Sequence, residues 1–282
     1  MIDIRICTTI VALVLGAQTA FAQETRAITQ IAGDLYRFQN NFHYSVFLVT
    51  PDGVIATDPI NADAARWLKN EIKQRFDRPI KYVIYSHDHV DHSSGGEVFA
   101  DQAIVIGHDN AKQAILGEKR PTAVPDITFS DRMTIELGGQ SIELIHVGRS
   151  HSNNMVAIHF PAQRTVFAVD FIAIKSLPYR NLTDAYFPDW IDAVKMVEAL
   201  DFDILVPGHG SLGTKADVRA HREYLEALYQ AVLDAARAGL SLEQMQAQIK
   251  LTDYSHFGMY TEWLPLNIEG MYNQISLHRR GN

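Results

Sequence analysis

Apolar and polar residues alternate along most of the chain with the period of β-strands, and a helical period appears at a few places. Pro51-Asp52-Gly53 separates two strand-like stretches, which predicts a hairpin turn. Asn61 can cap a helix that extends to about Phe76. The predicted strands lie at 28–38 (around a Gly-Asp turn), 44–50, 53–57, 80–85, 103–106, 133–137, 140–147, 154–160, 165–169 and 204–206. The predicted helices lie at 62–76, 96–101, 110–116, 189–200, 217–238 and from 241 onward.

The order of these elements suits two mixed β-sheets that pack face to face and are covered by helices on their outer sides. Residues 120–129 contain two prolines and are expected to form a loop. From about residue 214 the chain is helical, and residues 254–272 are rich in aromatic side chains. No internal repeat or linker interrupts the sequence. We therefore expect a single domain at 23–282 with a C-terminal helical extension from about 214.

Residues 1–22 have the pattern of a secretory signal peptide. The apolar stretch at 6–15 is too short to span a bilayer, and Ala20-Phe21-Ala22 fits a signal cleavage site. The mature chain is then expected to begin at Gln23, in a periplasmic or secreted protein that keeps no membrane attachment. Cys7, the only cysteine, leaves with the signal. A metal site in the mature chain must therefore use His, Asp, Glu and water.

The 282 residues are 47% hydrophobic, and the formal net charge is −8. No run rich in Lys and Arg offers the positive surface that nucleic acids require, so we expect no nucleic-acid partner. Gly-x-Ser-x-Gly, phosphate-loop and dinucleotide-binding glycine patterns are also absent from the sequence. Composition and motifs favour a small-molecule substrate and leave the oligomeric state open.

The chemistry of the sequence is concentrated in His87-x-His89-x-Asp91-His92, which follows the apolar stretch at 80–85. Imidazole nitrogens and carboxylate oxygens are the usual ligands of a catalytic zinc ion. A sharp turn after a strand can direct all four side chains into one cavity, whereas a regular helix or strand would point them apart. The alternative is a polar surface loop, and so dense a cluster directly after an apolar strand argues against it.

Three further residues with metal-binding side chains end apolar stretches or lie just beyond them. His151 follows a turn at Gly148, Asp170 ends the stretch at 165–169, and His209 lies in Pro-Gly-His-Gly. Because strand ends can meet at one edge of a sheet, we expect these side chains to join the first motif. The sequence thus offers seven candidate metal ligands.

Together these motifs resemble the metallo-β-lactamase superfamily from about Ile28 to His221. The resemblance implies an αβ/βα four-layer sandwich with two zinc ions at one edge of the sheets. The ligands of the first zinc would be His87, His89 and His151. The ligands of the second would be Asp91, His92 and His209. Asp170 would bridge the two ions or serve the second, and Asp58 looks like the family's carboxylate that supports the ligands from behind.

The segment from His151 to Ile172 resembles subclass B1 β-lactamases in more detail. The likeness continues at Ile174-Lys175-Ser176, Asn181-Leu182, Asp184-Ala185-Tyr186 and Trp190. Those enzymes have a cysteine ligand where this chain has Asp170, and an Asp here is similar to the superfamily's lactonases and thioesterases. They also bind the substrate carboxylate with a lysine, which implies this role for Lys175, although its offset from the metal ligand differs here.

The resemblance implies an exported zinc hydrolase in which a metal-bound hydroxide opens a cyclic amide of the β-lactam kind, with Asp91 and Lys175 as catalytic residues. A lactonase, or another ester or thioester hydrolase, shares the ligand set and is the first alternative. A glyoxalase-II-type activity is disfavoured because its glutathione substrate belongs to the cytosol. An iron-dependent sulfur oxygenase shares much of the first motif. The complete ligand set argues against a non-catalytic binding protein.

The remaining His and aromatic residues carry weaker functional signals. His43 either covers the site or lies half-exposed in a loop, and His146 is a candidate for supporting a metal ligand. His108 is expected to begin a helix on the surface. His159, His221 and His278 are expected to be solvated or at the edge of packing. A core position is favoured over pocket lining for Tyr254, His256, Phe257, Trp263 and Asn267, and packing is expected of Trp67 and Trp190.

Overall fold

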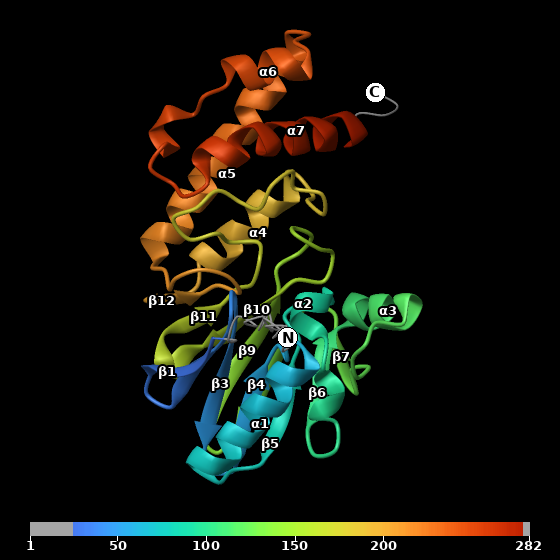
Figure 1. The fold of residues 1–282 in the computed structure, drawn as a ribbon, viewed down its shortest axis with the longest axis vertical. Helices are drawn as coiled ribbons and strands as arrows, with labels where there is room; N and C mark the ends of the chain where they lie inside the picture. Colours follow the sequence, from blue (N-terminus) through green and yellow to red (C-terminus); the bar gives the residue numbers. More distant parts are fainter. Residues whose placement is uncertain (1–24, 279–282) are drawn as a thin grey trace, which may run out of the picture.

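The structure is a computed structural model that describes residues 25–278. Two β-sheets pack face to face, with helices on both outer sides (Figure 1). The first sheet has the spatial order β1 (Arg26–Ala32), β2 (Leu35–Asn40), β3 (His43–Thr50), β4 (Gly53–Thr57), β5 (Ile80–Ile84), β6 (Ile104–His108) and β7 (Ile127–Phe129). The second has the order β12 (Ile204–Val206), β11 (Thr165–Phe167), β10 (Val156–Phe160), β9 (Gln140–His146) and β8 (Arg132–Leu137). The α-helices are α1 (Ala62–Phe76), α2 (Val90–Ser93), α3 (Asp109–Glu118), α4 (Asp189–Glu198), α5 (Lys215–Arg237), α6 (Leu242–Gln248) and α7 (Tyr260–His278).

Three buried apolar clusters hold the layers together. Phe47 and Leu68 belong to the cluster between the first sheet and α1. Leu48 and Leu144 belong to the cluster between the two sheets. Leu225 belongs to a third cluster, which joins the second sheet to α4, α5 and α7. Helix, sheet, sheet and helix therefore form four layers, and the predicted αβ/βα sandwich is confirmed.

The apolar runs of the sequence follow from this layering. Neighbouring residues of a strand point to opposite faces, so Phe47 and Leu48 of β3 enter different clusters. Every residue of β4 and of β10 is buried, because both faces of these strands are covered. Continuous apolar stretches in the sequence therefore mark strands in the middle of the sandwich.

Strand direction brings the candidate ligands to one edge of the sandwich. Strands β4 to β7 pair in parallel, as do β11 and β12, so their carboxyl ends lie on the same side. Asp58 follows β4, the first His motif follows β5, Asp170 follows β11, and His209 follows β12. His151 lies in the connection from β9 to β10 at the same edge. The sheet topology, rather than the sequence spacing, assembles the site.

The C-terminal helices α5, α6 and α7 stack beyond α4, at the end of the molecule away from α1 (Figure 1). The hydroxyl of Tyr224 in α5 donates to Asn267 Oδ1 in α7 at 2.7 Å. Asn267 Nδ2 in turn donates to the Pro178 carbonyl at 3.0 Å, which fastens α7 to the segment that leads into α4. The division into one domain with an extension from about residue 214 stays a prediction.

Several boundaries differ from the sequence-based expectation. The predicted loop at 120–129 is wrong at its end, where Ile127–Phe129 forms β7 beside β6. The expected helix at 96–101 is a short 3-10 turn at Gly96–Val98, and the strand expected to reach residue 169 ends at Phe167. The predicted signal lies outside the described residues. Between residues 25 and 278, no helix is both long and apolar enough to cross a membrane.

Candidate metal centre

The first group of candidate ligands comprises His87, His89 and His151. His89 Nδ1 and His151 Nε2 lie 3.0 Å apart, and the ligand atoms of the group all lie within 4.8 Å of one another. His87 is fully buried, and its Nε2 has no hydrogen-bond partner among the described residues. A buried polar atom without a partner is costly, and a cation between the three rings would remove that cost.

The second group comprises Asp91, His92, Asp170 and His209. His92 Nε2 lies 3.3 Å from His209 Nε2 and 3.2 Å from Asp170 Oδ2. Asp91 Oδ2 lies 3.8 Å from each of the two imidazole nitrogens. Two imidazoles and two carboxylates that converge in this way have the mixed nitrogen and oxygen character that zinc accepts.

Asp170 lies between the two groups. Its Oδ2 lies 3.6 Å from His151 Nε2 and 3.7 Å from His87 Nε2, while its Oδ1 lies 3.3 Å from His209 Nε2. Oδ1 is buried and has no hydrogen-bond partner in the described part of the chain. This position suits a carboxylate that bridges two ions, and the bridging role stays a prediction.

A tight turn directs the side chains of the first motif into the site. The single-turn helix α2 begins directly after His89, which keeps an extended ψ of 145°. Ser93 Oγ donates to the carbonyls of Asp88 and His89 and closes the turn. Gly208 is required beside it, because a Cβ there would lie 2.8 Å from His92 Cε1 and 2.9 Å from Asp170 Oδ1. Because the motif lies on a loop, its ligand side chains can point into one site, whereas a regular helix or strand would point them apart.

Asp58 orients one imidazole in each group. Asp58 Oδ2 accepts from His92 Nδ1 at 3.1 Å and from the Ser86 hydroxyl at 2.6 Å. Because the Ser86 hydroxyl donates to Asp58, its oxygen accepts from His87 Nδ1, which lies 3.0 Å away. Both imidazoles are thereby held with Nε2 facing the centre, as a metal requires. This geometry supports the expectation for Asp58 and adds Ser86, whose role the sequence did not reveal.

His209 and Asp91 are held by the turn between β2 and β3. His209 Nδ1 donates to the Phe42 carbonyl at 2.9 Å, which leaves Nε2 for the centre. His43 Nε2 lies 3.5 Å from Asp91 Oδ2, and its ring centroid lies 4.7 Å from that of His209. Of the two expectations for His43, the structure therefore favours the one in which it covers the site.

The charges of the centre also suit metal ions. Burial alone would raise the pKa of Asp170, but nearby imidazoles, His92 first, hold that pKa well below its usual range. Burial likewise would lower the pKa of His92, yet Asp170 and then Asp58 hold it well above its usual range. Without metal, a proton on His92 thus lies between two carboxylates. A metal ion would supply positive charge to the same groups.

The sequence pattern of the metallo-beta-lactamase superfamily matches residues 40–209. The chain belongs to the metallo-β-lactamase superfamily. The 2,4-dinitroanisole O-demethylase of Nocardioides sp. (strain JS1661) is similar, with 29% identity to its alpha subunit over 71% of this chain and 62% of the subunit, so the chain spans less than two thirds of that relative. Identity to its beta subunit is 26%, over 91% of this chain and 79% of the subunit.

Two β-lactamases are also similar. Metallo-beta-lactamase type 2 of Bacteroides fragilis is 21% identical over 71% of this chain and 85% of its own length. The structure of a metallo-beta-lactamase from Pontibacter korlensis superposes with a TM-score of 0.64 at 22% identity, covering 72% of this chain and 99% of that protein. These likenesses support the superfamily fold, and the finer likeness to subclass B1 stays a prediction.

The superfamily consists mostly of hydrolytic metalloenzymes, and the structure brings together all seven candidate ligands of this member. Lys175 forms its ion pair with a residue outside this set. Its side chain is 71% exposed, and its Nζ lies 3.9 Å from Asp217 Oδ1 at the start of α5. Its positive φ of 54° sets the direction in which the side chain leaves the backbone. The substrate contact implied for Lys175 therefore stays a prediction.

Several expectations for the other histidines are wrong, because neighbouring layers bury His108, His159 and His221. His108 begins α3 as expected but is 4% exposed rather than on the surface. His159 is buried between Glu143 and the Asp201 carbonyl, and His221 is buried against the Phe171 carbonyl. His146 donates to the Met155 carbonyl and stacks on His108, a contact away from the ligands. The side chain of His278 lies outside the described part.

A polar cavity of about 450 Å³ opens beside the first group of ligands. Its lining combines the two ligand-bearing loops with the segment before α4 and with Gln274 of α7. The charged lining residues are Asp88, Glu118, Arg120 and Asp184, apart from His89 and His151. Arg120 already forms two ion pairs: its Nη2 lies 2.8 Å from Asp88 Oδ2 and 2.9 Å from Glu118 Oε2. No local pattern in the sequence indicated Arg120 or Gln274.

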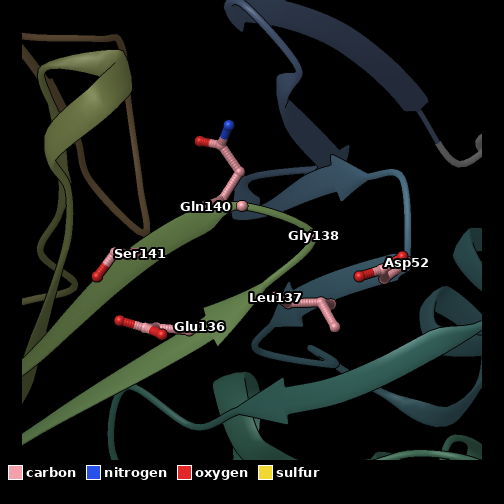
Figure 2. Close-up of a pocket in the computed structure, with 7 residues that line it drawn as sticks. Asp52, Glu136, Leu137, Gly138, Gln140 and Ser141 are labelled. Atoms are coloured by element: carbon pink, nitrogen blue, oxygen red, sulfur yellow. The ribbon is translucent and has the colours of Figure 1, made fainter.

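The aromatic tail largely follows the core expectation. Phe257 and Asn267 are buried, and Tyr254 packs against Tyr224. The core expectation is wrong for His256, which is exposed at the surface. A second cavity, of about 350 Å³, lies at the opposite edge of the sandwich between Asp52 and the β8–β9 hairpin (Figure 2). None of the candidate metal ligands lines it, so the functional centre belongs to the other edge.

Proposed function

We propose that the protein is an exported hydrolase that holds two zinc ions and opens a cyclic amide or ester. The observation that carries the proposal is the convergence of two ligand groups, each with its ligand atoms within 4.8 Å of one another. Within residues 25–278, the buried atoms His87 Nε2 and Asp170 Oδ1 have no hydrogen-bond partner, which supports a metal between them. When bound, two zinc ions supply Lewis acidity and lower the pKa of a shared water towards roughly 7.

Asp91 is suited to orienting the attacking water. Its side chain is 45% exposed, at the open side of the second group. Burial would raise its pKa, but the contact with His43 and the nearby His92 lower it to about 2. A carboxylate with so low a pKa stays ionised at neutral pH and accepts hydrogen bonds. We therefore assign Asp91 to binding and orienting the nucleophile rather than to storing a proton.

A cyclic amide of the β-lactam kind is the first substrate class that we propose. The B1-like segment and the similarity to the Bacteroides fragilis β-lactamase support it. In this proposal the carboxylate of the substrate requires a cation near the centre. Lys175 is the residue proposed for that contact, and it would have to turn from Asp217 towards the site.

A neutral ester or lactone is the second candidate, and the charge of the cavity favours it. The three carboxylates and one guanidinium of the lining leave a formal charge of −2, apart from the two histidines. An anionic group entering this cavity would meet like charge, and Arg120 already serves two carboxylates. The similarity to an enzyme named as an O-demethylase also supports a substrate with a carbon–oxygen bond.

Metal analysis and matched substrates test the proposal. Protein comprising residues 23–282, dialysed and reloaded, should hold two zinc ions per chain. One equivalent would overturn the dinuclear assignment, and one iron with no hydrolysis would favour the sulfur oxygenase. Hydrolysis of a β-lactam, its neutral methyl ester and a neutral lactone should then be compared. Faster turnover of both neutral substrates would support the second candidate, and no hydrolysis by the two-zinc protein would overturn the hydrolase.

Export is a separate part of the proposal and rests on the pattern at residues 1–22. The test is to produce the full chain in a bacterial host and to sequence the N-terminus of the protein found in each fraction. A periplasmic or secreted product that begins at Gln23 is expected. A product that keeps residues 1–22 in the cytosol would contradict export without affecting the metal assignment.

A further inference from the structure

Asp170 lies in an unusual backbone turn. Its φ is +65°, and the Phe171 N–H donates to the Val169 carbonyl at 2.8 Å across it. A positive φ in the middle of a three-residue turn is strained for any residue with a side chain, and it persists only when the surroundings hold it. The turn brings the carboxylate of Asp170 nearest to the second group, 3.2 Å from His92 Nε2 and 3.3 Å from His209 Nε2, so its support matters most to that group.

The carbonyl that follows this turn accepts two hydrogen bonds from the helical layer. Trp190 Nε1 of α4 donates to the Phe171 carbonyl at 2.6 Å, and His221 Nε2 of α5 donates to it at 3.2 Å. The two side chains are only 2% and 1% exposed. A carbonyl oxygen has two lone pairs, and both are used here by buried donors.

The protonation of His221 is settled by its surroundings. Burial lowers the pKa of His221 to about 4, so the ring is neutral at physiological pH. Its Nδ1 has no partner among the described residues, whereas Nε2 faces a carbonyl, so the single proton belongs on Nε2. A buried nitrogen without a partner is costly. An apolar side chain would fill this position without leaving a buried nitrogen unpaired. The presence of a histidine therefore indicates that its Nε2–H donor is needed.

We infer that Trp190 and His221 are positioning residues, which hold the turn at Asp170 and thereby set the affinity of the second metal. Both side chains donate to the Phe171 carbonyl rather than to a ligand atom. The Trp190 ring also lies edge-on to that of His151, with 6.3 Å between the ring centroids. The inference rests on the proposed metal centre. It also explains why the helical layer beyond the second sheet bears on a site built from loops at the sheet edge.

The test uses variants that remove a donor and retain bulk, namely Trp190→Phe and His221→Leu. His221→Gln is the rescue variant, since the Nε2 amide of glutamine can donate a hydrogen bond in place of the imidazole Nε2–H. Trp67→Phe in α1 and His159→Leu at the edge of β10 are matched controls, because both side chains pack far from the Asp170 turn. Zinc affinities of both sites are measured by competition with a chelator, together with the melting temperature of metal-free protein.

Trp190→Phe and His221→Leu should weaken the second zinc by about 10–100-fold, as loss of supporting residues of metal sites does, and should weaken the first much less. Phenylalanine keeps an aromatic ring beside His151. His221→Gln should recover most of the loss, and the controls should lower the melting temperature without changing either affinity. Equal weakening of both zinc ions, or a lower melting temperature with unchanged affinities, would overturn the inference. Failure of the wild type to bind a second zinc would instead overturn the proposed function.

Discussion

The two groups of ligands differ in how the chain builds them. The first takes its three imidazoles from two loops, and those loops are tied to each other: Asp88 Oδ1 accepts from Asn154 Nδ2 at 2.7 Å, and the Asp88 N–H donates to Asn154 Oδ1 at 3.0 Å. The second takes its ligands from three separate segments, and the side chains of Asp91 and His209 are 45% and 42% exposed.

This difference suggests two kinds of metal site in one centre. The two loops of the first site are hydrogen-bonded to each other, so this site is organised before a metal ion binds. An open site assembled from distant segments depends on contacts such as that of His209 with Phe42. We therefore expect the first site to bind zinc more tightly, and the open second site to exchange its metal ion and water more readily.

Removal of one ligand from each group should give unequal results. His89→Ala should lose the first zinc and abolish hydrolysis, and it should weaken the second zinc because Asp170 lies between both. His209→Ala should lose only the second zinc, with hydrolysis strongly reduced. Metal content and turnover are measured for both. Retention of two zinc ions by His209→Ala would contradict the ligand assignment.

Replacement of Asp58 should weaken both sites and destabilise the fold. Asp58 is fully buried and supports His92 directly and His87 through Ser86. Asp58→Ala leaves buried polar groups without their charged partner, which costs about 3–5 kcal/mol of the free energy of unfolding. Denaturant unfolding of metal-free protein checks this value, with the exposed Asp77→Ala as control. An unaltered stability, or weakening of only one zinc, would show that Asp58 does not serve both groups.

The support of the second site should be sensitive to acid. The pKa of His221 is lowered by burial to about 4, below about 6.5 in the unfolded chain, so the unfolded state binds the proton more tightly. The contribution of His221 is therefore complete above about pH 6.5 and is lost as the pH falls towards 4, by roughly 3 kcal/mol. Unfolding from pH 7.5 to 4 should show a shallower loss in His221→Gln than in wild type. Parallel curves would contradict this linkage.

The tie between the loops of the first site should matter to that site alone. Asn154→Leu removes both hydrogen bonds to Asp88 and should weaken the first zinc by about 10–100-fold while sparing the second. Asn70→Leu, at an exposed position of α1, is the control. Chelator competition gives both affinities. A change confined to the affinity of the second zinc would show that Asn154 does not support the first site.

The smallest effect is expected at Lys175. The exposed ion pair with Asp217 contributes about 0–1 kcal/mol, so Lys175→Ala should leave stability and the KM of a neutral substrate nearly unchanged. KM is compared for a carboxylate-bearing substrate and its neutral ester. A rise of tenfold or more for the anionic substrate alone would place Lys175 at the open site and favour the β-lactam class.

Much of the site was predictable from local patterns. The dense motif from His87 to His92 and the strand-terminal positions of Asp170 and His209 indicated a metal site, because few other arrangements concentrate such ligands after apolar strands. The apolar runs likewise indicated buried strands, because strands covered on both faces have no polar side. The resemblance to a known superfamily then implied how the ligands divide between two ions.

The sequence by itself determined which residues can bind metal and which stretches lie inside the sandwich, since side-chain chemistry and periodicity are local properties. The tertiary structure decided the rest. His221 is buried and donates to the Phe171 carbonyl, and Arg120 forms ion pairs with two carboxylates. The His221 bond and the Arg120–Asp88 pair connect segments that are far apart in the chain. Nothing local distinguishes such residues from solvated ones, because their roles arise only when sheets and helices pack and bring distant segments into contact.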